Sequence, residues 1–206
     1  PRATGNPCAP ARPAAANPCA ARSPAAPAMP ANPCAAQAVT GDSANPFDTK
    51  GGHAEAPYGD KMPDIVSNYL RAAPYVGTGG VVRPGAFVTL RDLGFRSVIN
   101  LNTADEGAAE DGRAATEAGL GYANLPVTEL APLSEQVDAF SRHVNDPANY
   151  PVLVYCQSSN RVGAMWALYR ARNGVPPEIA IQEGRTVGLK PSREVAVREV
   201  LGLPPQ

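Results

Sequence analysis

The chain has few of the residues that mark metal, haem or membrane proteins. Its two histidines, His53 and His143, do not have the spacing of a metal site, and no CxxCH sequence is present for covalent haem attachment. No apolar run is long enough to span a membrane. The formal net charge is −1, far from the positive balance of a general nucleic-acid-binding protein. We therefore expect no metal, no cofactor, no nucleic-acid partner and no transmembrane segment.

Residues 1–38 differ in composition from the rest of the chain. They are rich in proline and alanine and contain the sequence NPCA three times, which supplies Cys8, Cys19 and Cys34. Proline disfavours regular helix and sheet, and the small side chains cannot build a core, so we expect an irregular or polyproline-like extended tail. The three cysteines could form one disulfide or bind a soft metal, although their spacing matches no common zinc motif.

The tail also carries charge of one sign. Arg2, Arg12 and Arg22 are its charged residues, and the first acidic residue of the chain is Asp42. The tail could be a flexible tether, or it could lie along the acidic surface of a protein partner. No signal peptide is evident, and the chain starts at Pro1, as expected for a processed N-terminus. With the repeated cysteines, these features indicate an exported, periplasmic bacterial protein.

The remaining residues divide into a linker and a domain. Residues 39–66 are rich in glycine, aspartate and proline and are predicted to be a linker, whereas residues 67–206 alternate short apolar runs with helical patterns. This alternation predicts one α/β domain with a parallel sheet and covering helices. We expect strands at 97–101, 122–127 and 151–155 and helices at 84–94, 108–118, 134–144 with Ser134 as N-cap, 162 onward, 176–187 and 192–201.

The segment 151–169 carries the strongest chemical signal. The run Pro151–Tyr155 is short, apolar and β-branched, as in a strand buried on both faces, and it delivers Cys156 into a polar loop that Arg161 closes at a helix start. The loop residues between them are Gln157, Ser158, Ser159 and Asn160. Loop amides and a helix N-terminus favour a bound oxyanion and a thiolate, and arginine adds a fork of donors. We predict that Cys156 and Arg161 are catalytic and that the loop binds a phosphate-like group, although Cys156 could instead be a buried small hydrophobe.

Several short segments resemble a known family. They are YVGTGG at 75–80, LRDLGFRSVINLNT at 90–103, GLGYANLPV at 119–127 and the cysteine loop itself. Together, over about residues 68–201, they resemble the bacterial beta-lactamase-hydrolase-like phosphatases, relatives of the dual-specificity phosphatases. The resemblance implies a phosphatase-like central, mainly parallel sheet flanked by helices. It also implies that the cysteine attacks phosphorus, that the loop amides and the arginine hold the phosphoryl oxygens, and that an acid from a separate loop protonates the leaving group.

The resemblance points to a candidate for that acid. In dual-specificity phosphatases a strand with a proline near its end leads into the loop of the catalytic aspartate, and here the segment 122–127 leads to Glu129. Glutamate can serve, because the step needs a carboxylic acid within hydrogen-bond reach. Asp105 and Glu106, after the strand 97–101, are second candidates, although they could also begin the next helix, where negative charge is favourable.

The chain departs from the wider superfamily at four points. Four residues, rather than five, separate Cys156 from Arg161, as in the bacterial branch and also in rhodaneses. Ser159 replaces a usual glycine, Tyr155 a common histidine, and Val162 a frequent serine or threonine that helps the cysteine leave. Glycine is normally used where backbone approaches an anion or adopts a positive φ, so Ser159 could distort the loop.

Three functional classes follow from these patterns. The first is a phosphatase that hydrolyses a phosphate monoester through a phosphocysteine intermediate, with Cys156 as nucleophile, Arg161 as oxyanion clamp and Glu129 as acid. The second is a weakly active or inactive phosphatase-like accessory subunit that docks by its tail onto a larger periplasmic or membrane-associated complex. The third is a rhodanese-like sulfurtransferase, which the loop length permits but which the missing Gly-Gly turn and tryptophan downstream disfavour.

Overall fold

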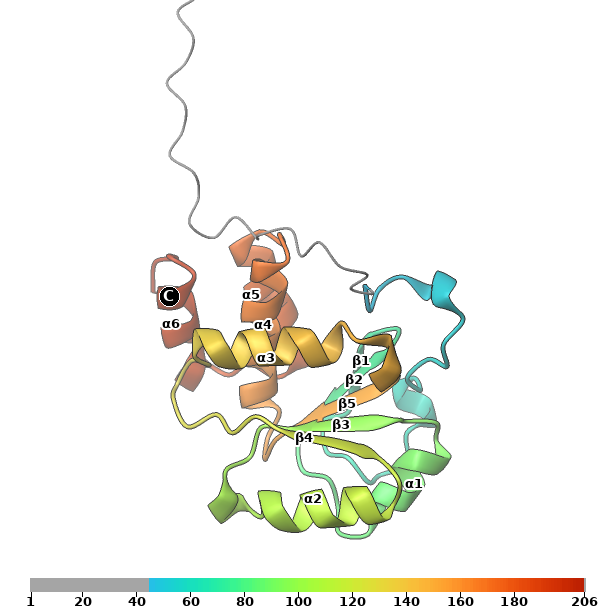
Figure 1. Ribbon diagram of the computed structural model, residues 1–206. Coiled ribbons are helices and arrows are strands. Elements are labelled where there is room, and N and C mark those ends of the chain that lie inside the picture. The colour runs from blue at the N-terminus through green and yellow to red at the C-terminus, as the bar shows by residue number, and fades with distance from the viewer. Residues whose placement is uncertain (1–44, 206) are drawn as a thin grey trace, which may run out of the picture. The chain divides into compact units, whose positions relative to one another are not determined.

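Residues 45–205 are described by a computed structural model of the chain (Figure 1), and the predicted tail with Cys8, Cys19 and Cys34 lies outside the described residues. One five-stranded sheet has the order β1-β2-β5-β3-β4, in which β1 is antiparallel to β2 and the other neighbours are parallel. This confirms the predicted mainly parallel sheet. The strands are β1 (Leu70–Ala73), β2 (Val76–Gly79), β3 (Ser97–Asn100), β4 (Gly121–Asn124) and β5 (Val152–Tyr155).

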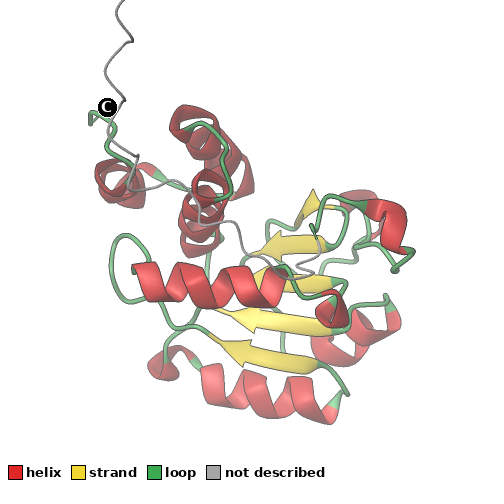
Figure 2. Ribbon diagram, turned by 45° about the horizontal axis from the view of Figure 1, so that its top comes forward, coloured by secondary structure: helices red, strands yellow, loops and turns green. Residues whose placement is uncertain are grey.

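Helices cover both faces of the sheet. In Figures 1 and 2, α1 and α2 lie on one face and α3 lies on the other with the C-terminal helices. The helices are α1 (Ala86–Asp92), α2 (Ala108–Glu117), α3 (Ser134–Val144), α4 (Asn160–Arg172), α5 (Pro177–Val187) and α6 (Pro191–Val200). None of the helices in the described residues combines the length and the apolar character that crossing a membrane requires.

The predicted N-cap of α3 is wrong by one residue. Leu133 is the N-cap, and Ser134 is the first helical residue. The side-chain oxygen of Gln136 accepts a hydrogen bond from the Leu133 backbone N–H at 2.7 Å, so a residue inside the helix caps its start. The Ser134 hydroxyl is used elsewhere and accepts from Arg172 at 2.8 Å.

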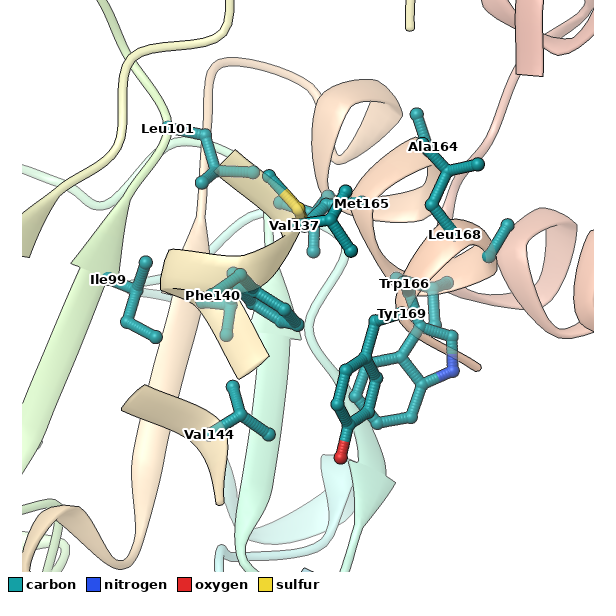
Figure 3. Close-up of a cluster of buried hydrophobic side chains, with 14 of the residues drawn as sticks. Ile99, Leu101, Val137, Phe140, Val144, Ala164, Met165, Trp166, Leu168 and Tyr169 are labelled. Carbon is teal, nitrogen blue, oxygen red and sulfur yellow. The ribbon is translucent and has the colours of Figure 1, made fainter. Parts of the chain in front are cut away.

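Two hydrophobic clusters hold the sheet between its helices. Successive side chains of a strand point to opposite faces. Thus Val154 of β5 belongs to the cluster with α3 and α4, whereas Leu153 belongs to the cluster with α1 and α2. Figure 3 shows part of the first cluster, in which Phe140 of α3 lies near Ile99 of β3 and near the α4 side chains. Every residue of β5 is at most 1 % exposed, so the end of this strand is fixed from both sides.

The described part of the predicted linker, 45–66, is packed against the domain. The Phe47 ring lies 6.1 Å from the Trp166 ring between centroids, and the Arg170 guanidinium stacks over Phe47 at 4.2 Å. Ala56 and Val66 are buried. These residues therefore contribute to the core rather than only connecting the tail to it.

Candidate active site

Cys156 immediately follows the central strand β5. Its backbone N–H donates to the carbonyl of Gly79, at the end of β2, over 3.4 Å. The thiol is free, 1 % exposed, and belongs to the hydrophobic cluster of α3 and α4. Parallel strands place their carboxyl ends at one edge of a sheet, where α/β proteins bind ligands. The structure therefore confirms the prediction that Cys156 follows the end of a strand.

The backbone of residues 156–161, here called the cysteine loop, has unused donors. Helix α4 begins at Asn160, two residues earlier than predicted, so Asn160 and Arg161 occupy its first turn. Within the described part of the chain, none of the N–H groups from Gln157 to Arg161 has an acceptor. Helix α4 adds the partial positive charge of its N-terminus. Successive free amides beside a helix N-terminus form a site that suits an oxyanion.

Arg161 is buried and bonded to a carboxylate. Its two terminal nitrogens each donate to one oxygen of Glu106, both over 2.6 Å. The hydrogen bonds from Arg161 lower the pKa of Glu106 to about 2, against its burial, and Thr103 adds a bond from its backbone N–H. Burial opposes the charge of Arg161, but its interactions with Glu106 and with the nearby Cys156 raise its pKa. Glu106 thus orients Arg161 and stays ionised.

The remaining bonds of Arg161 tie it to the segment after β3 and, through the carbonyl of Val127 at 3.5 Å, to the segment after β4. One terminal nitrogen also donates to the carbonyl of Leu101 at 3.3 Å, and the other to the side-chain oxygen of Asn102 at 3.2 Å. Both terminal nitrogens are therefore engaged by protein oxygens, rather than left as an open fork. The Nε–H of Arg161 has no oxygen acceptor among the described residues.

A chain of polar side chains supports this arrangement from the opposite face. The Asn100 side-chain oxygen accepts from the Asn102 backbone at 2.8 Å, and its nitrogen donates to Asp111 at 3.1 Å. The Tyr155 hydroxyl donates to the same Asp111 oxygen at 3.1 Å, and burial raises the pKa of Asp111. Tyr155, which stands where relatives have histidine, therefore braces β5 against α2.

Ser159 is accommodated by a glycine of another element. Its φ is 64°, in the left-handed region that a glycine would normally occupy. Gly188, which follows α5, has a φ of 136°, and a Cβ atom on it would lie 2.5 Å from the Ser159 Cβ. The buried Ser159 hydroxyl has no hydrogen-bond partner in the described residues. The glycine that the family pattern leads one to expect at 159 is therefore replaced by a serine packed on Gly188.

A cavity of about 410 Å³ lies beside the cysteine loop. Its walls come from three regions, namely the ends of β3 and β4, the cysteine loop and the start of α6. The lining residues are Thr103, Glu106, Val127, Thr128, Ser158, Asn160, Arg161 and Arg193. Another cavity, of about 650 Å³ along α2 and β4, is lined largely by alanine, glycine and threonine, and Cys156 is among the lining residues of neither cavity.

The candidate acids occupy different positions. Glu129 is exposed on the loop after β4, next to Thr128 of the cavity wall, but is not itself among the lining residues. Asp105 is exposed in the short turn Ala104–Glu106. As a second candidate acid Glu106 is wrong, because a carboxylate that accepts two bonds from Arg161 has no proton to donate.

Two contributors to the site were not predicted. Glu106 pairs with Arg161 across a separation of 55 positions in the chain, which no local spacing reveals. Arg193 reaches the cavity from α6, a helix expected only to close the domain. The one feature of the sequence that could have indicated Arg193 is its place in the first turn of a helix, where a positive charge is unfavourable without an anion nearby.

Comparisons with known proteins concern the fold and the family of the chain. A search of the curated proteins finds no match. Solved structures with a similar fold include a DUF442 protein from Shewanella putrefaciens, with 23% identity, a TM-score of 0.52 and coverage of 66% of this chain and 93% of that one. Another is a variant of P. aeruginosa TpbA in complex with phosphotyrosine, with 21% identity, a TM-score of 0.54 and coverage of 70% and 89%.

The catalytic core of the S. cerevisiae PP-IP phosphatase SIW14, in complex with citrate, is similar over 66% of this chain and 86% of that one, with 17% identity and a TM-score of 0.52. At these identities the structures show the fold alone. The model of the family described as "Beta-lactamase hydrolase-like protein, phosphatase-like domain" matches residues 64–173, which include the cysteine loop. The chain belongs to this family of phosphatase-like domains.

Proposed function

We propose that this protein hydrolyses phosphate monoesters through a phosphocysteine intermediate. The observation that carries the proposal is the cysteine loop, in which free amides from Gln157 to Arg161 surround the end of a strand that presents Cys156. Fixed donors aimed at an oxyanion stabilise the charge that a phosphoryl group spreads over its oxygens during transfer. The buried Arg161 lies at the end of this loop, in the first turn of α4.

The proposed reaction has two displacements. The Cys156 thiolate attacks phosphorus, the bond from phosphorus to the ester oxygen breaks, and Glu129 gives its proton to that oxygen. Water then attacks the phosphocysteine, gives a proton to Glu129, and releases orthophosphate and the thiolate. The loop amides from residues 157–160 and Arg161 hold the non-bridging oxygens throughout. Glu106 keeps the guanidinium in place.

A second candidate is oxyanion binding with little or no turnover, as in an accessory subunit. Two observations favour it. Both terminal nitrogens of Arg161 are already bonded to Glu106, and Ser159 holds a left-handed conformation without the freedom of glycine. The predicted partner of the N-terminal tail and the predicted periplasmic location concern this candidate, and both stay predictions.

The test is hydrolysis of 4-nitrophenyl phosphate by the full chain under reducing conditions. We expect release of orthophosphate that is lost in Cys156→Ser and falls by at least about 10²-fold in Arg161→Ala. Cyanide-dependent sulfur transfer from thiosulfate is measured in parallel. Thiocyanate formation that requires Cys156 would replace the proposal with a sulfurtransferase, and orthophosphate binding without hydrolysis would favour the accessory role.

A further inference from the structure

Helix α6 is tied to the cysteine loop at its first turn. The side-chain oxygen of Asn160 accepts from the Lys190 backbone N–H at 2.8 Å, and its nitrogen donates to the Ser192 hydroxyl at 3.1 Å. Both ends of this amide are therefore used to dock α6. Arg193 follows directly and lines the cavity together with Arg161. The two arginines come from different elements but share one cavity.

Arg193 lacks the carboxylate partner that comparable arginines have. Among the described residues, nine arginines form ion pairs with aspartate or glutamate, and three do not. Those three are Arg96, Arg142 and Arg193. The first two are exposed to water, whereas Arg193 is half-buried. A half-buried cation without an anion is costly, unless a ligand supplies the anion.

The guanidinium of Arg193 is held by one nitrogen only. Its Nη1 donates to the carbonyl of Glu129 and, over 3.1 Å, to that of Leu130. The N–H groups of Nε and Nη2, three in all for an arginine, have no acceptor in the described part of the chain. The side chain is thus positioned by the loop after β4, while one edge of the guanidinium keeps its donors beside the cavity.

We propose that Arg193 binds a second phosphoryl group of the substrate, next to the one held by the cysteine loop. The inference rests on the proposed function and assigns its substrate class, namely compounds that carry two neighbouring phosphoryl groups. Burial and the charge of Arg161 lower the pKa of Arg193, and the nearby Cys156 and Glu106 offset only part of this lowering. A bound polyanion would oppose the lowering further. The cavity of about 410 Å³ has room for more than one phosphoryl group.

The test measures binding to the unreactive Cys156→Ser protein by calorimetry, with inorganic orthophosphate and inorganic tripolyphosphate as probes. We expect tripolyphosphate to bind at least about tenfold more tightly than orthophosphate, because each charge-assisted hydrogen bond contributes about that factor. Adding Arg193→Gln should reduce this preference to less than about threefold and leave orthophosphate binding within about threefold. Glutamine removes the charge and keeps an amide donor, on a side chain two atoms shorter than that of arginine.

The matched control is Arg142→Gln in the same background. Arg142 is exposed, has no carboxylate partner among the described residues, and lies in the last turn of α3, which leads to the opposite edge of the sheet. Arg142→Gln changes the net charge by the same amount as Arg193→Gln, so we expect it to leave the preference for tripolyphosphate over orthophosphate unchanged. A preference that survives Arg193→Gln, or that falls equally in both variants, would overturn the inference.

Hydrolysis of 4-nitrophenyl phosphate by the unmutated protein separates the two proposals. If hydrolysis occurs and Arg193→Gln leaves the preference unchanged, only the assignment of Arg193 fails. If the Cys156→Ser protein binds neither probe and the unmutated protein shows no hydrolysis, both proposals fail.

Discussion

Two of the loops that line the cavity are held in place very differently. The cysteine loop has buried supports, since Arg161 bonds to Glu106 and the Ser159 side chain packs on Gly188. The loop after β4, residues 128–133, is held mainly by exposed hydrogen bonds, which Arg193 and Gln136 donate to its carbonyls and to that of Pro126. The proposed anion site is therefore held by buried residues, whereas Glu129, the proposed acid, lies on a surface loop.

Because of this difference, substitutions in the two loops should affect the free energy of unfolding and the rate of turnover to different degrees. Changes at Cys156, Ser159 and Arg161 of the cysteine loop should affect both folding and turnover, because these three residues are buried. Changes in the loop after β4 should affect turnover while leaving the free energy of unfolding almost unchanged. The predictions below test that separation, from the largest expected effect to the smallest.

Glu129→Gln should slow turnover of esters with poor leaving groups without changing stability. An amide cannot give a proton, so we expect kcat for phenyl phosphate to fall by about 10²-fold or more. For 4-nitrophenyl phosphate, whose leaving group needs little protonation, the loss should be less than about tenfold. Because Glu129 is exposed, the free energy of unfolding should change by less than about 0.5 kcal/mol. Steady-state kinetics and urea titration measure both quantities.

Asp105→Asn provides the matched comparison, because Asp105 is the other exposed carboxylate predicted as an acid. We expect its kinetics to equal those of the unmutated protein. A leaving-group-dependent loss in Asp105→Asn, together with normal rates in Glu129→Gln, would move the acid to the turn Ala104–Glu106.

Gly163→Ala should destabilise the domain by about 3 kcal/mol, because the interface of α4 and α5 has no room for a methyl group. A Cβ atom there would lie 2.1 Å from the Leu189 nitrogen and 2.6 Å from the Gly184 carbonyl oxygen. Backbone atoms cannot move aside as a flexible side chain could. Gly59→Ala is the control, since a Cβ at that position meets nothing within 4 Å. Equal unfolding midpoints in urea for the two variants would contradict the close packing.

Glu106→Gln should remove a pH-dependent part of the stability. The pKa of Glu106 is lowered from 4.5 to about 2 by its bonds to Arg161, so its contribution is present above pH 4.5 and is lost as the pH falls towards 2. Breaking the pair leaves Arg161 buried without its anion. Because the Glu106 side chain is 31% exposed, we expect a loss of about 2 kcal/mol at pH 7, less than for a fully buried pair.

Thermal unfolding measured from pH 2 to 7 checks this prediction. The difference between the two proteins should shrink steadily below pH 4.5. Glu110→Gln serves as the control, because its pair with Arg113 is mostly exposed and should contribute less than about 0.5 kcal/mol. A difference that persists unchanged at pH 2 would mean that Glu106 acts through packing rather than through its charge.

Local pattern was enough to predict most of the domain. The buried run at 151–155 and the helices around it follow from apolar periodicity, and the structure has them within a few residues. Strand β4 is shorter than expected, ending at Asn124 rather than 127, although Leu125 still donates to the Asn100 carbonyl. Strands β1 and β2 were not predicted as strands, because their glycines, alanines and charged residue give no alternation. In the sheet, β2 is stabilised by pairing with β5, and β1 by pairing with β2.

The site could be predicted only where its residues are neighbours in sequence. Cys156 and Arg161 are five positions apart and were found from a motif. Glu106 and Arg193 join them through the parallel sheet and the return of α6, and both contacts depend on the tertiary structure. The consequence of Ser159 was also beyond the sequence, because its accommodation depends on Gly188, on another element.

Ser159→Gly should stabilise the domain by about 1 kcal/mol. A serine at φ 64° destabilises the folded protein by about 1–2 kcal/mol relative to an unstrained conformation. Glycine removes this strain, but it also increases the entropy of the unfolded chain, which cancels part of the gain in stability. The same change removes a buried hydroxyl without a partner in the described residues. Asn68→Gly is the control, at the other non-glycine residue with positive φ, because asparagine tolerates that region and Asn68 is exposed. If urea titration shows Ser159→Gly to be the less stable protein, the packing of the serine on Gly188 outweighs the strain, and this chain requires serine in its cysteine loop.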